Sequence, residues 1–254
     1  MLLSFYAALA DFDTYARIGA AVARDLWAEG CSLALTGFSK FQAVQDLAQE
    51  LISKRTHNNQ RVTAHQLDTG DSSAVEKLFR DIKSEYGQDG PDILVSNAGY
   101  GKRFPGILDV SLEEFDHTIN VNLRASFILS KLSIPHMETQ GWGRIVFVSS
   151  IAAIGGGINA CHYAASKGGL SAMMRNLAAK HAKSGITVND VAPAMIGDTG
   201  MIPSEEFVAG TPGDVKNIPV GRLGTPEECA GVITMCCKTG YLTGQSILLS
   251  GGLK

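Results

Sequence analysis

A tyrosine and a lysine four positions apart could together carry out acid–base chemistry in this chain. Tyr163 and Lys167 lie in the run 161–167, and a helix places positions i and i+4 on one face. A tyrosine hydroxyl ordinarily titrates at about pH 10, and a nearby lysine cation favours the phenolate and lowers its pKa. The spacing therefore predicts a proton donor beside the charge that tunes it.

An apolar run upstream of this pair predicts a buried strand that delivers hydroxyl groups to the edge of a sheet. Residues 143–148 are largely apolar and β-branched, and Ser149 and Ser150 follow them. Open parallel sheets bind ligands at the carboxyl ends of their strands. Ser150 precedes Tyr163 by thirteen residues (163 − 150), with the glycine-rich loop 155–157 between them. A serine hydrolase is disfavoured because no Gly-x-Ser-x-Gly elbow is present.

Segments typical of strands and helices alternate along the whole chain. With continuously apolar strands, this alternation predicts an α/β fold whose parallel sheet is covered on both faces, the doubly wound or Rossmann-type arrangement. We expect strands near 2–9 and at 31–36, 61–66, 92–96, 144–149, 186–191 and 245–250. We expect helices at 18–29, 40–54, 71–86, 111–137, 161–183 and 225–237. No linker or repeat divides the chain, so 1–254 should form a single domain.

Composition and charge narrow the classes of function. The 254 residues carry a net charge of −3 and have a pI near 6.1. This argues against a nucleic-acid surface, which needs clustered positive charge. The cysteines are odd in number and lack metal-ligand spacing, so we expect no metal site and reduced core thiols, as is typical of a cytosolic protein. These cysteines are Cys31, Cys161, Cys229, Cys236 and Cys237.

Membrane and targeting segments are also disfavoured. No apolar stretch is long enough to span a bilayer. The first ten residues faintly resemble a signal peptide, and Ala8-Leu9-Ala10 resembles a cleavage site. The basic segment that opens such peptides is missing, however, and cleavage would remove the first predicted strand. We therefore expect a cytoplasmic location.

These motifs, together with several others in the same order, resemble the short-chain dehydrogenase/reductase family. Asn97-Ala98-Gly99 follows a predicted strand, like the family's Asn-Ala-Gly turn, and Asn122 lies where the family has its catalytic asparagine. Asp68 matches the aspartate that meets the adenine of the cofactor. Further matches at 189–193, 222–228, 242–245 and 251–252 extend the resemblance over about residues 18–254. Within the family, the motifs are most similar to the 3-oxoacyl-(acyl carrier protein) reductase type.

The resemblance implies a fold and a reaction. The sheet should have seven strands in the order 3-2-1-4-5-6-7, and a hydride should pass between a nicotinamide and a small-molecule carbonyl or alcohol. Tyr163 would donate its proton to the forming alkoxide, which as general acid catalysis is worth about 10²–10⁴-fold. Ser150 would hold the carbonyl oxygen, and Lys167 would lower the pKa of the phenol and hold the ribose hydroxyls. Asn122 would anchor a water that links Lys167 to solvent.

The residues after the second strand bear on the choice of cofactor. Enzymes that use NAD carry an acidic residue there for the ribose 2′-hydroxyl, whereas residues 36–40 contain none. This favours NADP(H), with NAD(H) as the alternative. Phe38 occupies the usual arginine position, so Lys40 or Arg17 would have to meet the 2′-phosphate. The residues expected to contact the cofactor are Arg17, Ile18, Gly19, Phe38, Ser39, Asp68, Asn97, Ala98, Gly99, Tyr163, Lys167, Pro193 and Ile196.

The first loop departs from the family pattern, which opens with Thr-Gly-x-x-x-Gly-x-Gly so that the backbone can approach the pyrophosphate. The run 10–19 keeps only the last glycine, Gly19, and Arg17 stands where the middle glycine belongs. The acidic side chains of Asp11 and Asp13 oppose an anion site, although Arg17 could itself bind a phosphate. Three explanations stay open: an altered cofactor loop, an aberrant translation start, or loss of cofactor binding.

Two functions are compatible with this pattern. The first is an NADP-preferring carbonyl reductase or alcohol dehydrogenase with Tyr163 as its acid. The second is a non-catalytic scaffold or partner subunit that no longer holds a dinucleotide. The resemblance also implies a homotetramer or homodimer that pairs helices 111–137 and 161–183 and the edge of the C-terminal strand. The segment 194–220 should cover an apolar or acyl ketone through Met195, Ile196, Met201, Ile202 and Phe207.

Overall fold

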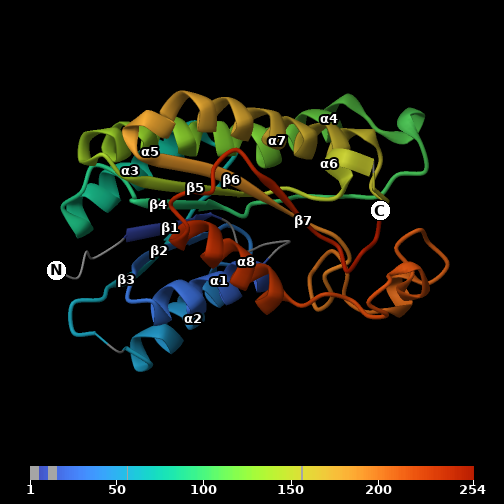
Figure 1. The fold of residues 1–254 in the computed structure, drawn as a ribbon, viewed down its shortest axis with the longest axis horizontal. Coiled ribbons are helices and arrows are strands. Elements are labelled where there is room, and N and C mark those ends of the chain that lie inside the picture. The colour runs from blue at the N-terminus through green and yellow to red at the C-terminus, as the bar shows by residue number, and fades with distance from the viewer. Residues whose placement is uncertain (1–5, 11–15, 56, 156) are drawn as a thin grey trace.

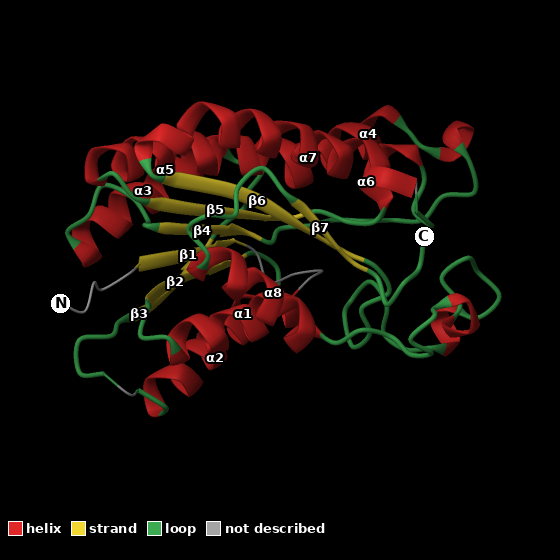
Figure 2. Cartoon of the chain, viewed as in Figure 1, coloured by secondary structure: helices red, strands yellow, loops and turns green. Residues whose placement is uncertain are grey.

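Seven parallel strands form one sheet in the order β3-β2-β1-β4-β5-β6-β7 (Figures 1 and 2). The structure is a computed structural model that describes residues 6–10, 16–55, 57–155 and 157–254. The order agrees with the one that the family resemblance implies. The strands are β1 (Tyr6–Ala10), β2 (Ser32–Gly37), β3 (Val62–Gln66), β4 (Ile93–Ser96), β5 (Gly143–Val148), β6 (Ile186–Pro193) and β7 (Ser246–Leu249).

Helices cover both faces of the sheet (Figure 1). One layer holds α1 (Ala16–Ala28), α2 (Phe41–Ser53) and α8 (Pro226–Lys238). The other holds α3 (Ser72–Tyr86), α4 (Leu112–Ile119), α5 (Ala125–Gln140) and α7 (Cys161–His181), with the short α6 (Ala152–Gly155) at one end. The predicted doubly wound α/β fold is therefore confirmed.

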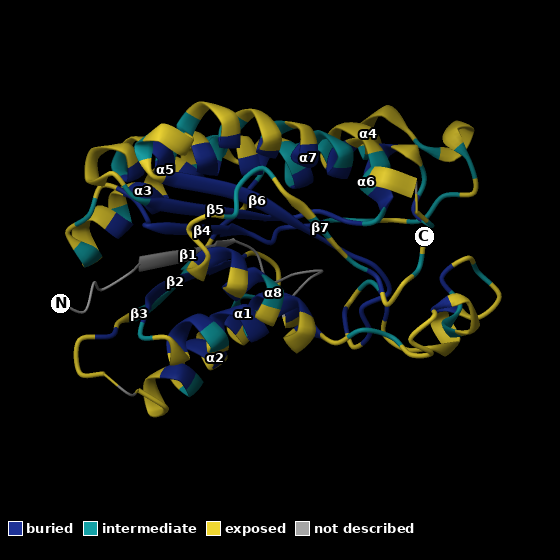
Figure 3. Ribbon diagram, viewed as in Figure 1, coloured by how far each residue is buried: buried dark blue, intermediate teal, exposed yellow. Residues whose placement is uncertain are grey.

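The central strands are apolar throughout because each of their faces packs against a helix layer. In β5, Val146 belongs to the core beneath α1 and α8, whereas Ile145 and Phe147 belong to the core beneath α5 and α7. All residues of β2, β4, β5 and β6 are buried, while β3 and β7 at the sheet edges are only partly covered (Figure 3). Continuous apolar runs are the expected signature of such doubly covered strands.

The predicted helix 111–137 has a different internal geometry from the one expected. Ser111 caps α4 by accepting a hydrogen bond from the backbone N–H of Glu114. A π-helical turn then spans Asn120–Arg124 before α5 continues to Gln140. A π turn contains one more residue than an α turn, and such turns are frequent at functional sites. Asn122 lies within this turn, and its side chain is fully buried.

Two further segments differ from the sequence-based expectation. Gly155, expected to open the loop 155–157, is the last residue of the short helix α6, and Gly157 has a positive φ of 64°. Helix α7 ends at His181 and is followed by a 3-10 turn at Ala182–Ser184, because Gly185 takes up a left-handed conformation. The first part of the predicted strand 2–9 and the cofactor-loop residues 11–15 lie outside the described residues.

Two other expectations concern the burial of the cysteines and the presence of membrane-spanning helices. Four cysteines are buried as predicted, but Cys161, the first residue of α7, is exposed, so the prediction of a core thiol is wrong there. Within the described ranges, no helix combines the length and the apolar composition needed to cross a membrane.

Candidate active site

The residues predicted to bind ligands lie at one edge of the sheet. Because all seven strands are parallel, their carboxyl ends point the same way. Phe38 follows β2, Asn97 follows β4, Ser149 and Ser150 follow β5, and Pro193 ends β6. This is the edge at which doubly wound sheets bind their ligands.

Tyr163 and Lys167 lie on the buried face of α7, one turn apart. Tyr163 is 1% exposed and Lys167 is 0% exposed, and the Lys167 Nζ atom lies 5.8 Å from the centroid of the Tyr163 ring. The ammonium also donates a 2.8 Å hydrogen bond to the carbonyl oxygen of Val148, at the end of β5. The prediction that the two side chains share a helix face is confirmed, and the face is turned toward the sheet.

Burial controls the charge of Lys167. Desolvation lowers its pKa from 10.5 to about 7, and the attraction of Asp190 opposes this shift. Asp190 is itself fully buried on β6, where its Oδ1 atom accepts hydrogen bonds from the hydroxyls of Ser149 (2.9 Å) and Ser246 (2.6 Å). Sequence reasoning did not single out Asp190. An acidic residue inside an apolar strand is the signal that could have found it.

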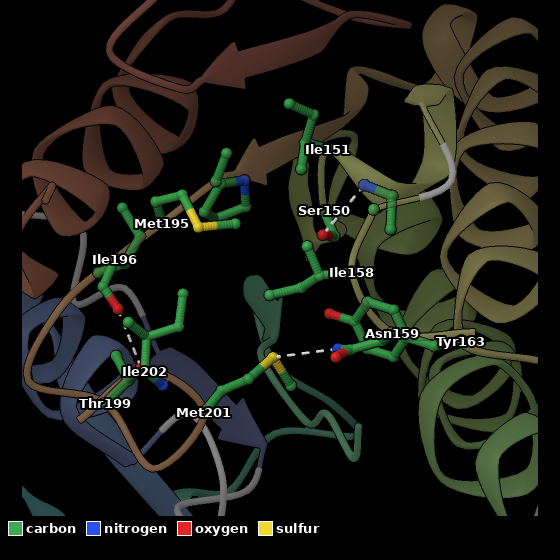
Figure 4. A pocket seen from close by; sticks show the side chains of 14 residues that line it. Ser150, Ile151, Ile158, Asn159, Tyr163, Met195, Ile196, Thr199, Met201 and Ile202 are labelled. Atoms are coloured by element: carbon green, nitrogen blue, oxygen red, sulfur yellow. Dashed lines mark hydrogen bonds between the residues drawn. The ribbon is translucent and has the colours of Figure 1, made fainter. Parts of the chain in front are cut away.

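A pocket brings Ser150 and Tyr163 together (Figure 4). It contains about 490 Å³ of empty space, part of it open to solvent. Ser150 is nearly buried, and its oxygen accepts a 3.2 Å hydrogen bond from the backbone N–H of Ala152. This bond uses the oxygen as an acceptor and fixes the side chain, so the hydroxyl hydrogen can be offered to a ligand. Figure 4 shows Ser150, Asn159 and Tyr163 on one side of the pocket.

The opposite wall comes from the segment 194–220. Met195, Ile196, Met201 and Ile202 line the pocket as predicted (Figure 4). Phe207 does not: its ring is 46% exposed and lies under the guanidinium of Arg103, whose central carbon is 4.4 Å from the ring centroid. The prediction for Phe207 is therefore wrong, because a contact with the loop after β4 holds the ring outside the pocket.

Asn122 connects three parts of the site. Its Oδ1 atom accepts a 2.7 Å hydrogen bond from the backbone N–H of Tyr100, and its Nδ2 atom donates to the carbonyl oxygen of Tyr100 and to the Ser166 hydroxyl, both at 2.9 Å. The Ser166 hydroxyl in turn donates to the carbonyl oxygen of Tyr163. Asn122 therefore ties the loop after β4 to the turn of α7 that carries the tyrosine.

The other residues expected to contact the cofactor differ in how far they are exposed. Asn97, Ala98 and Gly99 are buried after β4, whereas Phe38, Ser39 and Asp68 are exposed after β2 and β3. Asp68 accepts a 2.8 Å hydrogen bond from the backbone N–H of Gly70. Arg17 is exposed at the start of α1, and Gly19 is buried there. The side chain of Ile18 is buried in the core between α1 and α8, so only its backbone could meet a ligand.

His162, the residue before Tyr163, packs against an aromatic ring. Its ring is fully buried and meets the Phe104 ring edge-on, with centroids 5.4 Å apart. Burial lowers the pKa of His162, which favours the neutral ring. Among the described residues, no group of three or more metal-ligating side chains could hold a metal ion.

A doubly wound sheet with a buried Ser–Tyr–Lys set at its carboxyl edge defines a class of oxidoreductases. Residues 15–254 match the family model described as enoyl-(acyl carrier protein) reductase. The chain is 33% identical over 241 residues to the 3-oxoacyl-[acyl-carrier-protein] reductase FabG of Aquifex aeolicus, covering 93% of this chain and 92% of that protein. It is 32% identical over 246 residues to human dehydrogenase/reductase SDR family member 4, covering 92% and 83%.

The structural comparison agrees with these sequence matches. A solved short-chain dehydrogenase/reductase of Serratia marcescens, a mutant with two phenylalanines changed to leucine, superposes with a TM-score of 0.86 at 30% identity and covers 99% of this chain and 98% of that one. The chain belongs to the short-chain dehydrogenase/reductase family, and it is an oxidoreductase of the kind that uses a nicotinamide cofactor.

Proposed function

We propose that this protein reduces a ketone with NADPH, with Tyr163 as the general acid. The observation that carries the proposal is the convergence of Ser150 and Tyr163 on one largely apolar pocket, with the Lys167 ammonium buried behind the phenol. An uncharged, largely apolar pocket suits a neutral carbonyl substrate. The names of the relatives, which include 3-oxoacyl-[acyl-carrier-protein] reductases, support an acyl ketone as one candidate.

Each residue has a role that its surroundings support. When it is bound, the nicotinamide cofactor supplies the hydride. The Ser150 hydroxyl, held by the N–H of Ala152, donates a hydrogen bond to the substrate carbonyl. The Tyr163 phenol gives its proton to the oxygen that becomes an alkoxide, and the ammonium of Lys167 stabilises the phenolate that is left. Asn122 keeps the loop after β4 against α7, so the acid stays in place.

The described residues fit the nicotinamide half of the cofactor. Pro193 and Ile196 line the pocket, and Asn97, Ala98 and Gly99 are buried at the end of β4, at the same edge of the sheet, so these residues could hold that half. The absence of an acid in the run 36–40 supports a preference for NADP(H). Arg17 and Lys40, both exposed at this edge, are the cations that could meet phosphate groups.

One observation favours a second function, a scaffold or partner subunit that binds no dinucleotide. In the run 10–19, Gly19 is the only residue that keeps the family's glycine pattern, and the family-model match begins only at residue 15. Against this, the buried charge of Lys167 is costly to maintain, and a site that retains such a group is more often a working one. We therefore place the enzyme first.

The conservative variant Tyr163→Phe tests the proposal. It removes only the phenol hydroxyl that donates the proton. The rate of NADPH oxidation in the presence of a responsive ketone should therefore fall by about 10²-fold or more. The fold should be unaffected, as judged by circular dichroism and thermal melting. Cys161→Ser, a change at an exposed position two residues away, is the matched control and should keep wild-type turnover. Full activity in Tyr163→Phe would contradict the assignment of the acid.

A further inference from the structure

Asn159 places an amide in the pocket that the roles assigned so far do not use. The residue is 3% exposed and lines the same pocket as Ser150 and Tyr163 (Figure 4). Its Oδ1 atom is buried and accepts no hydrogen bond from any described residue. Buried carbonyl oxygens are nearly always paired, with protein, ligand or ordered water, so this oxygen points to a partner outside the chain.

The surroundings of the amide fix which end is available. Its Nδ2 atom donates a 3.6 Å hydrogen bond to the sulfur of Met201 (Figure 4). The same nitrogen lies 3.0 Å from the position that a Cβ atom on Gly101 would occupy. One hydrogen of the NH₂ group is therefore engaged by the segment 194–220, and the loop after β4 packs closely against the same nitrogen. The carbonyl oxygen leaves the amide in a different direction and remains as the acceptor.

The other polar groups of the pocket are already accounted for. Thr199 donates a hydrogen bond to the carbonyl oxygen of Ile196 and accepts one from the backbone N–H of Ile202. Ser150 and Tyr163 are assigned to the reacting carbonyl. The other lining residues are apolar or glycine, and none carries a charge. Among the described side chains that line the pocket, the Asn159 oxygen is thus the one acceptor without an assigned partner, and none of these side chains is charged, which disfavours a charged donor such as an ammonium.

We propose that Asn159 selects neutral ketones that carry a hydroxyl or amide N–H, and that its Oδ1 atom accepts the hydrogen bond from that donor. The inference rests on the proposed reductase function and names its substrate class. When a donor enters, it replaces the water that would otherwise pair with the oxygen. When a substrate with a methyl group in the same place enters, the acceptor loses its partner, and sites of this kind reject such analogues strongly.

Matched ketone pairs test this inference. In each pair a hydroxyl on the α, β or γ carbon is replaced by a methyl group, and kcat/KM with NADPH is measured for both members. The wild-type protein should prefer the hydroxyketone of at least one pair by about 10-fold or more. Asn159→Leu, which removes the acceptor at similar volume, should bring that ratio to about 1.

Asn159→Asp is the matched control, because it keeps an acceptor in the same place. Its overall rate can fall, but its preference for the hydroxyketone should persist, whereas Asn159→Leu should lose it. Circular dichroism and melting check that both variants fold, and Asn159→Ala replaces the leucine variant if that one does not.

Two outcomes would overturn the inference while the reductase function stands. They are equal rates for both members of every pair in the wild-type protein, and an undiminished preference in Asn159→Leu. If the wild-type protein reduces no ketone at all, the proposed function itself fails. The absence of any ketone reduction can be told apart from the two outcomes above, because both of them are measured on a protein that turns over a ketone.

Discussion

Lys167 is a buried cation whose charge changes near neutral pH. Burial brings its pKa to about 7, with Asp190 opposing the shift, while Asp190 is held by the hydroxyls of Ser149 and Ser246. An ammonium that titrates here can both stabilise a phenolate and exchange protons in the range where enzymes work. The buried carboxylate thus belongs to the same electrostatic unit as the Tyr163–Lys167 pair.

The depressed pKa predicts a pH dependence of stability. A lysine in the unfolded chain titrates at about pH 10.4, so between about pH 7 and 10 the unfolded state binds more protons than the folded state. Stability from this group must therefore rise with pH across that window, and the full cost of burying the charge is present below pH 7. Lys167→Met should remove this dependence.

Urea denaturation without cofactor, repeated from pH 7 to 10, measures this effect. The free energy of unfolding of the wild-type protein minus that of Lys167→Met should rise with pH. Lys77→Met, on the exposed side of α3, is the matched control for the change of lysine to methionine. A rise for Lys167→Met no larger than that of this control would show that the Lys167 ammonium is not desolvated in solution.

At the scale of elements, the π turn between α4 and α5 carries Asn122, whose side chain bonds to the loop after β4 and to α7. Asn122→Ala would remove three hydrogen bonds, a buried one to the Ser166 hydroxyl and two partly buried ones to the backbone of Tyr100, and would leave these groups with fewer partners. We expect a loss of about 2 kcal/mol or more in the free energy of unfolding, because unsatisfied buried groups cost about 1–3 kcal/mol each. Chemical denaturation measures the loss.

Asn120→Ala on the same turn is the control for this prediction. Asn120 is only partly buried, and its hydrogen bonds to the carbonyl oxygen of Gly70 and from Arg124 are longer, at 3.3 and 3.2 Å. Its loss should be smaller, below about 1 kcal/mol. Equal losses for the two variants would contradict the special role of Asn122 in holding the loop to α7.

The elements also show what the sequence could and could not predict. The strand ends carrying Ser150, Asn97 and Pro193 were predictable, because parallel strands with apolar runs must deliver their carboxyl ends to one edge. The π turn was not predictable from the sequence. One inserted residue leaves the helical repeat of apolar positions unchanged before and after it, so the pattern gives no sign of the insertion. The contributions of Asp190 and Asn159 also escaped prediction, because their partners are far away in the sequence and only the tertiary structure brings them together.

At the scale of the whole molecule, exposed apolar side chains support the proposed homo-oligomer. On α4 and α5, Leu112, Phe115 and Phe127 are 79%, 39% and 53% exposed. Isolated apolar residues are normal on a surface, but several large ones on adjoining helices favour an interface. Phe127→Arg should therefore shift the protein to a smaller species in light scattering at micromolar concentration.

Ile52→Arg is the matched control for this shift. Ile52 is 39% exposed but lies on α2, in the opposite helix layer. This variant should keep the wild-type size. A wild-type protein that is already monomeric would contradict the oligomer.

The central claim is that this chain still binds a nicotinamide dinucleotide despite its altered first loop. Calorimetric titration of the purified protein with NADPH, and then with NADH, tests it most directly. We predict micromolar binding of NADPH and weaker binding of NADH, since no acid follows β2 to hold a 2′-hydroxyl. Absence of binding by both, from protein shown to be folded, would contradict the reductase function and favour the scaffold.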